Sequence, residues 1–199
     1  MEEKYRKILV EVLFLGLAPA LAATINSISA ISMGVGIMFI MVLSTLTMRL
    51  LGSFVTEENK YFVTLVVTTL FASIYQMVTE AYFLVAYKNI GIYIAICSVN
   101  MMLFAVSNGA TKKEEKNIVV KAFLFSLAFC VIVFIVGSIR EIMGTGTFLG
   151  QVKDIPVKFF SDNKVLILQK APGAFMVGSI VTALVAFVLK KTGKNKEAK

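Results

Sequence analysis

Few side chains in this sequence are suited to chemistry, and most of them lie in apolar surroundings. Histidine is absent, which removes the commonest transition-metal ligand and most options for general acid–base catalysis. The two cysteines, Cys97 and Cys130, both fall within apolar segments, and neither belongs to a CxxC pair. Isolated cysteines of this kind are most often packing residues, so they do not by themselves predict a metal or redox site.

Three charged residues lie in apolar stretches of the sequence, at position 80 and at positions 140 and 141. A carboxylate inside a membrane is costly and is by default a candidate for ion passage, which makes Glu80 a candidate. Its alternative, which we favour, is a solvated place near the membrane interface. Arg140 and Glu141 are candidates for a contact to a partner or for a gate in an ion path. The alternative, which we favour, is that they belong to a turn that ends a helix and is capped by the following glycines. Asn100 is able to support irregular backbone through its amide hydrogen bonds.

The polypeptide that positions these residues contains a proline inside its first apolar segment, in residues 15–23 (LGLAPALAA). Proline removes a backbone donor and clashes with the preceding turn, and it pushes Ala18 toward extended backbone. Broken helices at membrane depth are tolerated only where the freed backbone groups face protein or a polar cavity. The sequence therefore predicts an interruption at Ala18–Pro19, with an ordinary proline kink as the alternative.

The composition is that of an integral membrane protein. Of the 199 residues 58% are hydrophobic, and the mean hydropathy is +0.84. A membrane helix needs about 20 apolar residues, and such runs recur along the whole chain. We expect a single all-α membrane domain, residues 1–199, with six transmembrane helices. The predicted spans cover about residues 8–24, 31–54, 61–87, 92–106, 118–139 and 171–189.

The first and fourth spans are short or interrupted and occupy corresponding places in the two halves. This pattern indicates two inverted three-helix repeats, about 1–88 and 89–199, with broken or half helices 1 and 4. The alternative is that no internal repeat exists, because any chain with six spans can be divided into two groups of three. Most Lys and Arg residues fall on the side that carries both termini, so the termini are predicted to be cytoplasmic and residues 140–170 to face outward. The net charge of +8 reflects this bias and does not indicate nucleic-acid binding.

Four motifs resemble the Rnf/Nqr membrane-subunit family, in the branch formed by the E-type subunits of Rnf and the D-type subunits of Nqr. They are LGLAPALAATINSISAISMGVG (15–36), QMVTEAYFLVAYKNIGIYIAICSVN (76–100), GSIREIMGTGTFLG (137–150) and APGAF (171–175). The resemblance implies a six-span subunit with two half-helices that pairs with a sister, the A-type subunit of Rnf or the E-type subunit of Nqr. It also implies a [2Fe–2S] cluster shared by the two sisters, with two cysteines from each. The resemblance further implies flavin-bearing partner subunits and electron transfer coupled to transport of Na⁺ or H⁺.

The chain departs from the family at the cluster positions. The family's cysteine in LGLCP corresponds to Ala18, and its cysteine in VNC corresponds to Met101. Alanine offers no ligand atom, and a thioether is a poor replacement for a thiolate. Cys97, one helical turn before Met101, is the candidate substitute. We therefore expect this chain not to ligate the cluster through residues 18 and 101 and to bind no cofactor itself.

The function expected from this resemblance is that of a subunit of an Rnf/Nqr-type electron-transport complex in the bacterial inner membrane. Such a protein is embedded in the lipid bilayer and is not catalytic alone. The alternative is a membrane transporter or structural partner that reuses the scaffold without a redox role.

Overall fold

The computed structural model describes residues 19–53, 55–56, 58–97, 99, 118–148, 157–158 and 166–197. Three of its helices are long and apolar enough to cross a membrane, namely α2 (Ser27–Leu50), α3 (Lys60–Tyr82) and α6 (Ile118–Thr145). Two further helices, α4 (Leu84–Cys97) and α7 (Ala171–Glu197), have shorter apolar stretches. The expectation of a membrane protein built from helices is confirmed.

Minor elements connect these helices. Residues 19–23 are helical, and a 3₁₀ turn, η1 (Leu51–Ser53), follows α2. After α6, two short antiparallel strands pair with each other: β1 (Thr147–Phe148) lies beside β2 (Val157–Lys158). A second 3₁₀ turn, η2 (Leu166–Gln169), leads into α7.

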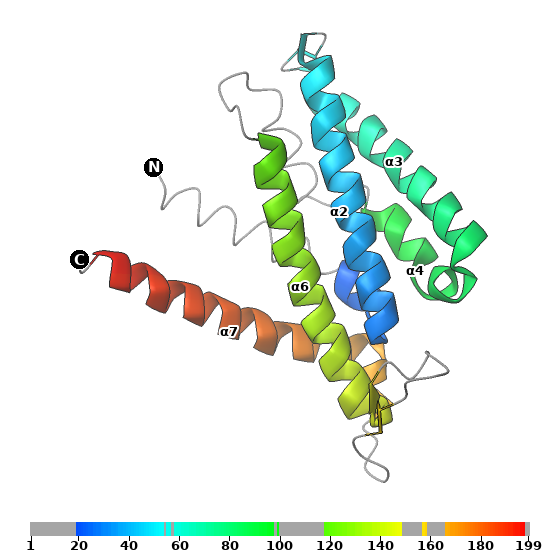
Figure 1. The fold of residues 1–199 in the computed structure, drawn as a ribbon, viewed down its shortest axis with the longest axis vertical. Coiled ribbons are helices and arrows are strands. Elements are labelled where there is room, and N and C mark those ends of the chain that lie inside the picture. Colours follow the sequence, from blue (N-terminus) through cyan, green and yellow to red (C-terminus); the bar gives the residue numbers. More distant parts are fainter. Residues whose placement is uncertain are drawn as a thin grey trace.

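The centre of the bundle is the antiparallel pair of α2 and α6, which lie side by side along most of their length (Figure 1). The buried residues Met33, Ile37 and Ile40 recur at helical spacing along α2 and belong to the same core as Phe129 and Val133 of α6. Small residues let these two backbones approach closely, as is usual between membrane helices. The same core takes in residues of the helical segment 19–23 and of α7.

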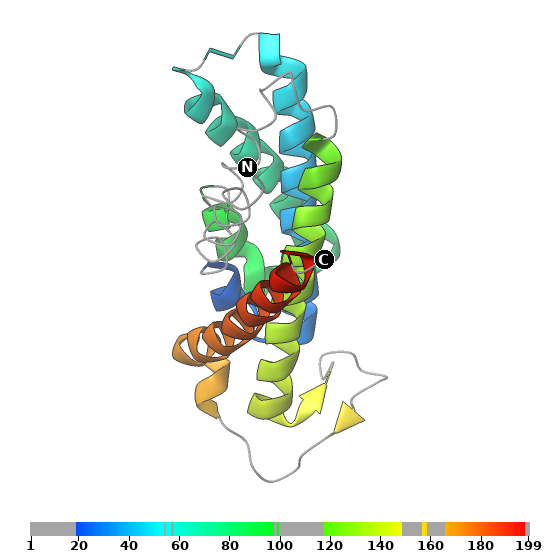
Figure 2. The ribbon, with the colours of Figure 1, turned by 90° about the vertical axis from the view of Figure 1, so that its left-hand side faces the viewer.

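On its other side α2 packs against α3 and α4. The Tyr75 hydroxyl of α3 donates a hydrogen bond to the carbonyl oxygen of Ser32 at 2.6 Å. Its ring lies over Gly36, where an added methyl carbon would stand 2.5 Å from the nearest ring atom. Asn89 of α4 donates to the Ser29 hydroxyl at 3.2 Å. Figure 1 and Figure 2 show that α7 lies at a steep angle to α6, and in Figure 1 its C-terminal end leaves the bundle.

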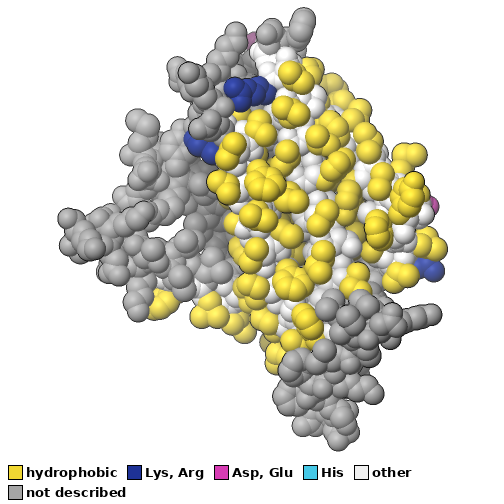
Figure 3. All heavy atoms as spheres, in the orientation of Figure 1, with side chains coloured by type: hydrophobic (Ala, Val, Ile, Leu, Met, Phe, Trp, Pro, Cys, Tyr) yellow, Lys and Arg dark blue, Asp and Glu magenta, His cyan; other side chains and the backbone are white. Residues whose placement is uncertain are grey.

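Hydrophobic side chains cover the face of the bundle seen in Figure 3, with the few basic side chains at its margins. Large apolar residues are exposed on each of the three long helices, for example Val35 of α2, Met77 of α3 and Ile135 of α6. An apolar outer surface of this extent is what a lipid environment requires.

Several predicted boundaries were wrong. The third span was predicted to reach about residue 87 and the fourth to begin at about residue 92, but α3 ends at Tyr82 and residues 88–91 (KNIG), between the two predicted spans, lie inside α4. The break occurs at Phe83, which has non-helical backbone angles (φ −130°, ψ 54°). Within α4 the Asn89 side chain makes a tertiary hydrogen bond to Ser29 and not the local backbone bond that would favour a turn. The predicted boundary between two repeats, at residues 88–89, consequently falls within a helix.

Candidate functional site

The predicted turn at Arg140 and Glu141 is instead the interior of α6, which continues to Thr145. Both side chains are buried, with exposed fractions of 0% for Arg140 and 2% for Glu141. The glycine cap does exist but one turn later, because Gly146 has a left-handed backbone (φ 73°) and its amide donates to the carbonyl of Ile142 at 3.0 Å. Two charged side chains within an apolar helix need partners, and the structure provides them.

Glu141 binds the start of α2. Its carboxylate oxygen Oε2 accepts a hydrogen bond from the backbone amide of Ser27, the first residue of that helix, at 2.8 Å. The N-cap residue, Asn26, is extended (φ −132°, ψ 161°) and makes no side-chain capping bond. The first amides of a helix have no partners within it and carry partial positive charge. The Glu141 carboxylate therefore caps α2 from another helix.

Arg140 binds backbone carbonyl oxygens of two other segments. Its Nη1 donates to the carbonyl of Leu21 at 2.9 Å and to that of Thr24. Its Nε donates to the carbonyl of Leu168 at 2.9 Å, and its Nη2 donates to that of Lys170 at 3.4 Å. One guanidinium thus joins the end of the helical segment 19–23 to the η2–α7 connection, using the several fixed donors that distinguish arginine from lysine.

Between these two anchors lies an irregular stretch that separates the helical segment 19–23 from α2. Helical backbone stops at Ala23, and residues 24–26 are irregular before α2 begins. Thr24 turns back on the preceding helix, since its hydroxyl donates to the carbonyl of Leu21 at 2.9 Å. Pro19 is the first residue that the structure describes in this part of the chain, and it is helical. Ala18, the other residue of the predicted interruption, lies outside the described residues, so the interruption at Ala18–Pro19 stays a prediction.

Glycines allow the surrounding helices to close on this break. A methyl carbon added to Gly137 of α6 would stand 2.5 Å from the Ala30 side chain and 3.4 Å from the carbonyl oxygen of Asn26. One added to Gly178 of α7 would stand 2.5 Å from the side chain of Leu21. The irregular segment is thus enclosed by protein on at least two sides, which is the condition under which broken backbone is stable at membrane depth.

The arrangement places opposite charges at opposite helix ends. The cationic Arg140 faces carbonyl oxygens at the end of one helical segment, and the anionic Glu141 faces the amide at the start of the next. Most of these bonds end on backbone groups, and Nη1 of Arg140 also donates to the Thr24 hydroxyl at 3.2 Å, so the two residues hold the backbone on both sides of residues 24–26. The sequence carried a signal for this role, because two adjacent charges within an apolar helix must be paired, but it did not reveal their partners.

The other predicted site residues lie elsewhere. Glu80 is exposed near the C-terminal end of α3, whose main contacts are with α2 and α4. Cys97 is buried at the end of α4, and Cys130 lies in the middle of α6 with its side chain against Gly34. Ala18, Asn100 and Met101 lie outside the described residues.

Fold and site together define a helical membrane protein in which buried Arg140 and Glu141 hold the irregular residues 24–26 between the helical segment 19–23 and α2. Comparison with known sequences identifies the class further. A family model described as "Rnf-Nqr subunit, membrane protein" matches residues 2–182, and the chain belongs to this family.

Individual relatives are similar over most of their length. The chain is 29% identical to the E subunit of the proton-translocating ferredoxin:NAD(+) oxidoreductase complex of Clostridium ljungdahlii, over 87% of this chain and 80% of that protein. It is 28% identical to the E subunit of the ion-translocating oxidoreductase complex of Buchnera aphidicola subsp. Schizaphis graminum, over 85% and 80%. For the E subunit of the corresponding complex of Klebsiella pneumoniae the identity is 26%, over 93% and 84%.

Proposed function

We propose that this chain is a membrane subunit, of the E type, in an ion-translocating oxidoreductase complex. The observation that carries the proposal is family membership over residues 2–182, together with relatives that are named as E subunits of such complexes. The alternative, a transporter or structural partner without a redox role, is not favoured by these relatives. The partners are other subunits of the complex, and among them a sister six-helix protein that corresponds to the A-type subunit of Rnf or the E-type subunit of Nqr. The location is the bacterial inner membrane, with both termini in the cytoplasm.

Within that complex Arg140 and Glu141 are positioning residues for the broken first segment. Their bonds to Leu21, Thr24 and Ser27 support this role, because they meet the backbone groups on either side of residues 24–26. This favours a supporting role over a mobile gate in the ion path. For Glu80 and Asn100 a part in ion passage or partner contact remains a prediction.

The six-span fold consists of two inverted three-helix repeats. Supporting this, the antiparallel helices α2 and α6 each follow a segment that the sequence predicts to be broken. Arg49 and Arg140 occupy the same position counted from the first residues of these helices, Ser27 and Ile118. The flanking sequences are also alike, with TMRLL at residues 47–51 and SIREI at residues 138–142.

The family's [2Fe–2S] cluster does not fit the donor atoms that this chain offers at the family positions, because alanine at residue 18 has no ligand atom and methionine at residue 101 offers only a thioether. Cys97 and Cys130 lie on different helices, α4 and α6. We therefore propose that this chain itself supplies no thiolate from those two positions, and that flavins reside on partner subunits.

The membership proposal is tested by purifying the full chain, tagged at its C-terminus, from its native membranes in a mild detergent. Mass spectrometry is expected to find flavin-bearing and iron–sulfur subunits in stoichiometric amounts. A matched preparation from cells with an untagged chain provides the background. Recovery of the chain alone, in a monodisperse and folded state, would show that it has left the complex.

The cluster proposal has a separate test on the same preparation. Iron and acid-labile sulfide analysis, with EPR of the reduced complex, counts the clusters, and comparison of the wild type with Cys97→Ser asks whether one of them depends on this chain. We expect an unchanged spectrum and an unchanged iron content in C97S. Loss of one [2Fe–2S] signal and of two irons per complex in C97S would mean that Cys97 is a ligand.

A further inference from the structure

We propose that Arg49 and Lys121 bind the headgroup phosphate of an anionic phospholipid, whose acyl chains lie along the adjoining faces of α2 and α6. This site does not depend on the proposed membership in a complex, because every residue in it belongs to this chain. It lies at the opposite end of the α2–α6 pair from Arg140 and Glu141.

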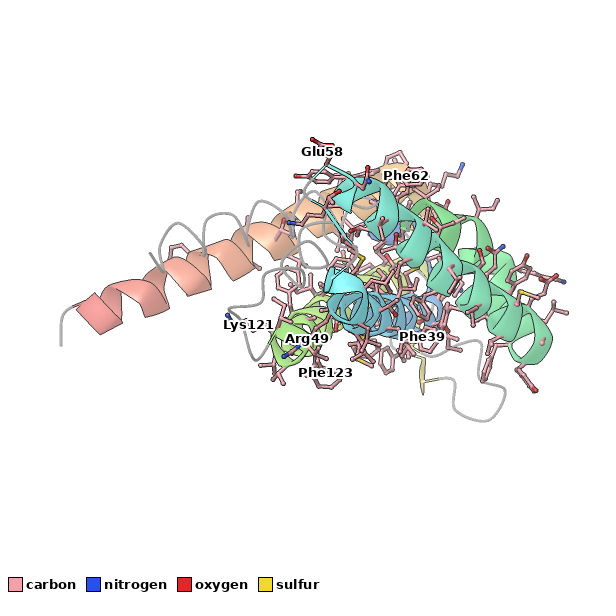
Figure 4. The ribbon with its side chains drawn as sticks, turned by 90° about the horizontal axis from the view of Figure 1, so that it is seen from above. Phe39, Arg49, Glu58, Phe62, Lys121 and Phe123 are labelled. Atoms are coloured by element: carbon pink, nitrogen blue, oxygen red, sulfur yellow. The ribbon has the colours of Figure 1, made fainter. Side chains whose placement is uncertain are left out.

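The two cations are brought together by the antiparallel packing of α2 and α6. Arg49 lies in the last turn of α2, and its neighbour Met48 shares a small buried cluster with Ile118, the first residue of α6. Lys121 lies one turn further along α6 from Ile118. Figure 4 shows Arg49 and Lys121 near each other on one outer side of the bundle, with Phe123 beside them.

Their exposure distinguishes these cations from Arg140. Arg140 is fully buried among backbone carbonyls, whereas Arg49 and Lys121 are both exposed on the outer surface of the bundle. Arg49 lies close to the apolar surface yet at the end of a spanning helix, where a long cationic side chain reaches the headgroup layer. This is the depth at which a phospholipid presents its phosphate.

The surface beside the cations is suited to acyl chains. On α2 the exposed fractions are 42% for Leu46 and 73% for Leu50, and on α6 they are 57% for Val120 and 44% for Phe123. Leu46 lies one turn before Arg49, and the exposed Leu124 lies one turn after Lys121, so each helix has an apolar side chain next to its cation on the side toward the middle of the bundle. A headgroup site with apolar surface on both helices fits a lipid with two chains.

The described ends of the two helices at this place carry positive charge. The first turn of α6 contains Lys121 and no acidic residue, although the start of a helix favours negative charge. Basic residues at the membrane surface contribute about 1 kcal/mol each to the binding of anionic lipid. Two such residues correspond to about a 30-fold preference at 1.4 kcal/mol per factor of ten.

The test uses the full chain, delipidated in mild detergent, with native mass spectrometry to measure retention of added phosphatidylglycerol or of phosphatidylcholine with the same acyl chains. The wild type is expected to prefer phosphatidylglycerol, and R49Q/K121Q to bind it about 30-fold more weakly. The charge-preserving variant R49K/K121R is expected to keep the preference. The control K88Q, which removes an exposed charge on α4, is expected to resemble the wild type.

Three results would overturn the proposal: equal retention of both lipids by the wild type, an undiminished preference in R49Q/K121Q, or equal loss in K88Q. A competition experiment with inorganic phosphate distinguishes a lipid ligand from free phosphate. If millimolar phosphate displaces phosphatidylglycerol completely, the pair is a site for free phosphate and the lipid assignment is wrong. Circular dichroism and size-exclusion chromatography establish that each variant is folded before its lipids are counted.

Discussion

The carboxylate of Glu141 and the backbone amide of Ser27 are 2.8 Å apart although 114 residues separate them in the sequence. Through this bond the last third of α6 completes the first turn of α2, whose own N-cap residue makes no side-chain bond. The neighbouring residue, Arg140, does the same for the carbonyl oxygens on the other side of the break. The helix ends on both sides of residues 24–26 are therefore stabilised by α6, and substitutions at Glu141 and Arg140 measure how much free energy these contacts contribute.

Removing the Glu141 carboxylate should destabilise the fold. In Glu141→Ala the Ser27 amide is left buried without this acceptor, at a cost of about 1–3 kcal/mol. Glu141→Gln keeps an acceptor oxygen and loses only the charge near the helix start, so it should cost about 0.3–1 kcal/mol. The free energy of unfolding, measured by denaturant titration in mixed micelles, should rank wild type, E141Q and E141A in that order. The control Glu80→Ala, at an exposed position on α3, should change it by less than about 0.5 kcal/mol.

We expect that a lysine at position 140 cannot provide the stability that Arg140 provides. The guanidinium reaches carbonyls in two segments at once, and a single ammonium group cannot match that geometry. We expect Arg140→Lys to lose about 1–3 kcal/mol of stability, and Arg140→Met to lose more because its carbonyl partners stay buried. Limited proteolysis of the folded R140K protein should show cleavage near residues 24–26 and 168–170. An R140K protein as stable and as protease-resistant as the wild type would contradict the assigned role.

Gly137 should be intolerant of even one added methyl group. Its Cβ position stands 2.5 Å from the Ala30 side chain, so Gly137→Ala must push α6 away from the break, at about 1–3 kcal/mol. Gly52 offers a matched comparison, because an added Cβ meets nothing within 4 Å there. Gly52→Ala should unfold at the same temperature as the wild type or slightly higher. Equal thermal shifts for the two variants would argue that the close approach at Gly137 is not a packing constraint.

The contact between Gly36 and Tyr75 should behave as a coupled pair. Gly36→Ala alone should be destabilising, because the new methyl group meets the Tyr75 ring. In a Tyr75→Ala background the ring is gone, and the same change should cost almost nothing, which a double-mutant cycle will measure. Tyr75→Phe isolates the 2.6 Å hydrogen bond to Ser32 and should cost about 0.5–1.5 kcal/mol. Additive effects of G36A and Y75A would place the ring elsewhere.

Much of the fold was predictable because hydrophobic length is a local property. The starts of α6 and α7, at Ile118 and Ala171, agree with the predicted spans. The cap of α6 by one of the glycines that follow Glu141 was also expected, since glycine adopts a left-handed backbone without strain, although the helix itself is longer than predicted. The boundary between α3 and α4 was not predictable in the same way. Residues 88–91 have the composition of a turn but lie inside α4, where Asn89 contacts Ser29 of α2, a partner that the local sequence does not reveal.

The sequence by itself determined that this is a membrane-embedded helical chain, because long apolar runs are visible residue by residue. Only the tertiary structure decided what Arg140 and Glu141 do. Their partners are backbone groups more than a hundred residues earlier and about thirty residues later. Backbone carbonyls and amides are the same at every position of a sequence, so no pattern of side chains could have named them. The pairing exists because helix ends buried in an apolar environment must be satisfied by whichever charged group the packing brings to them.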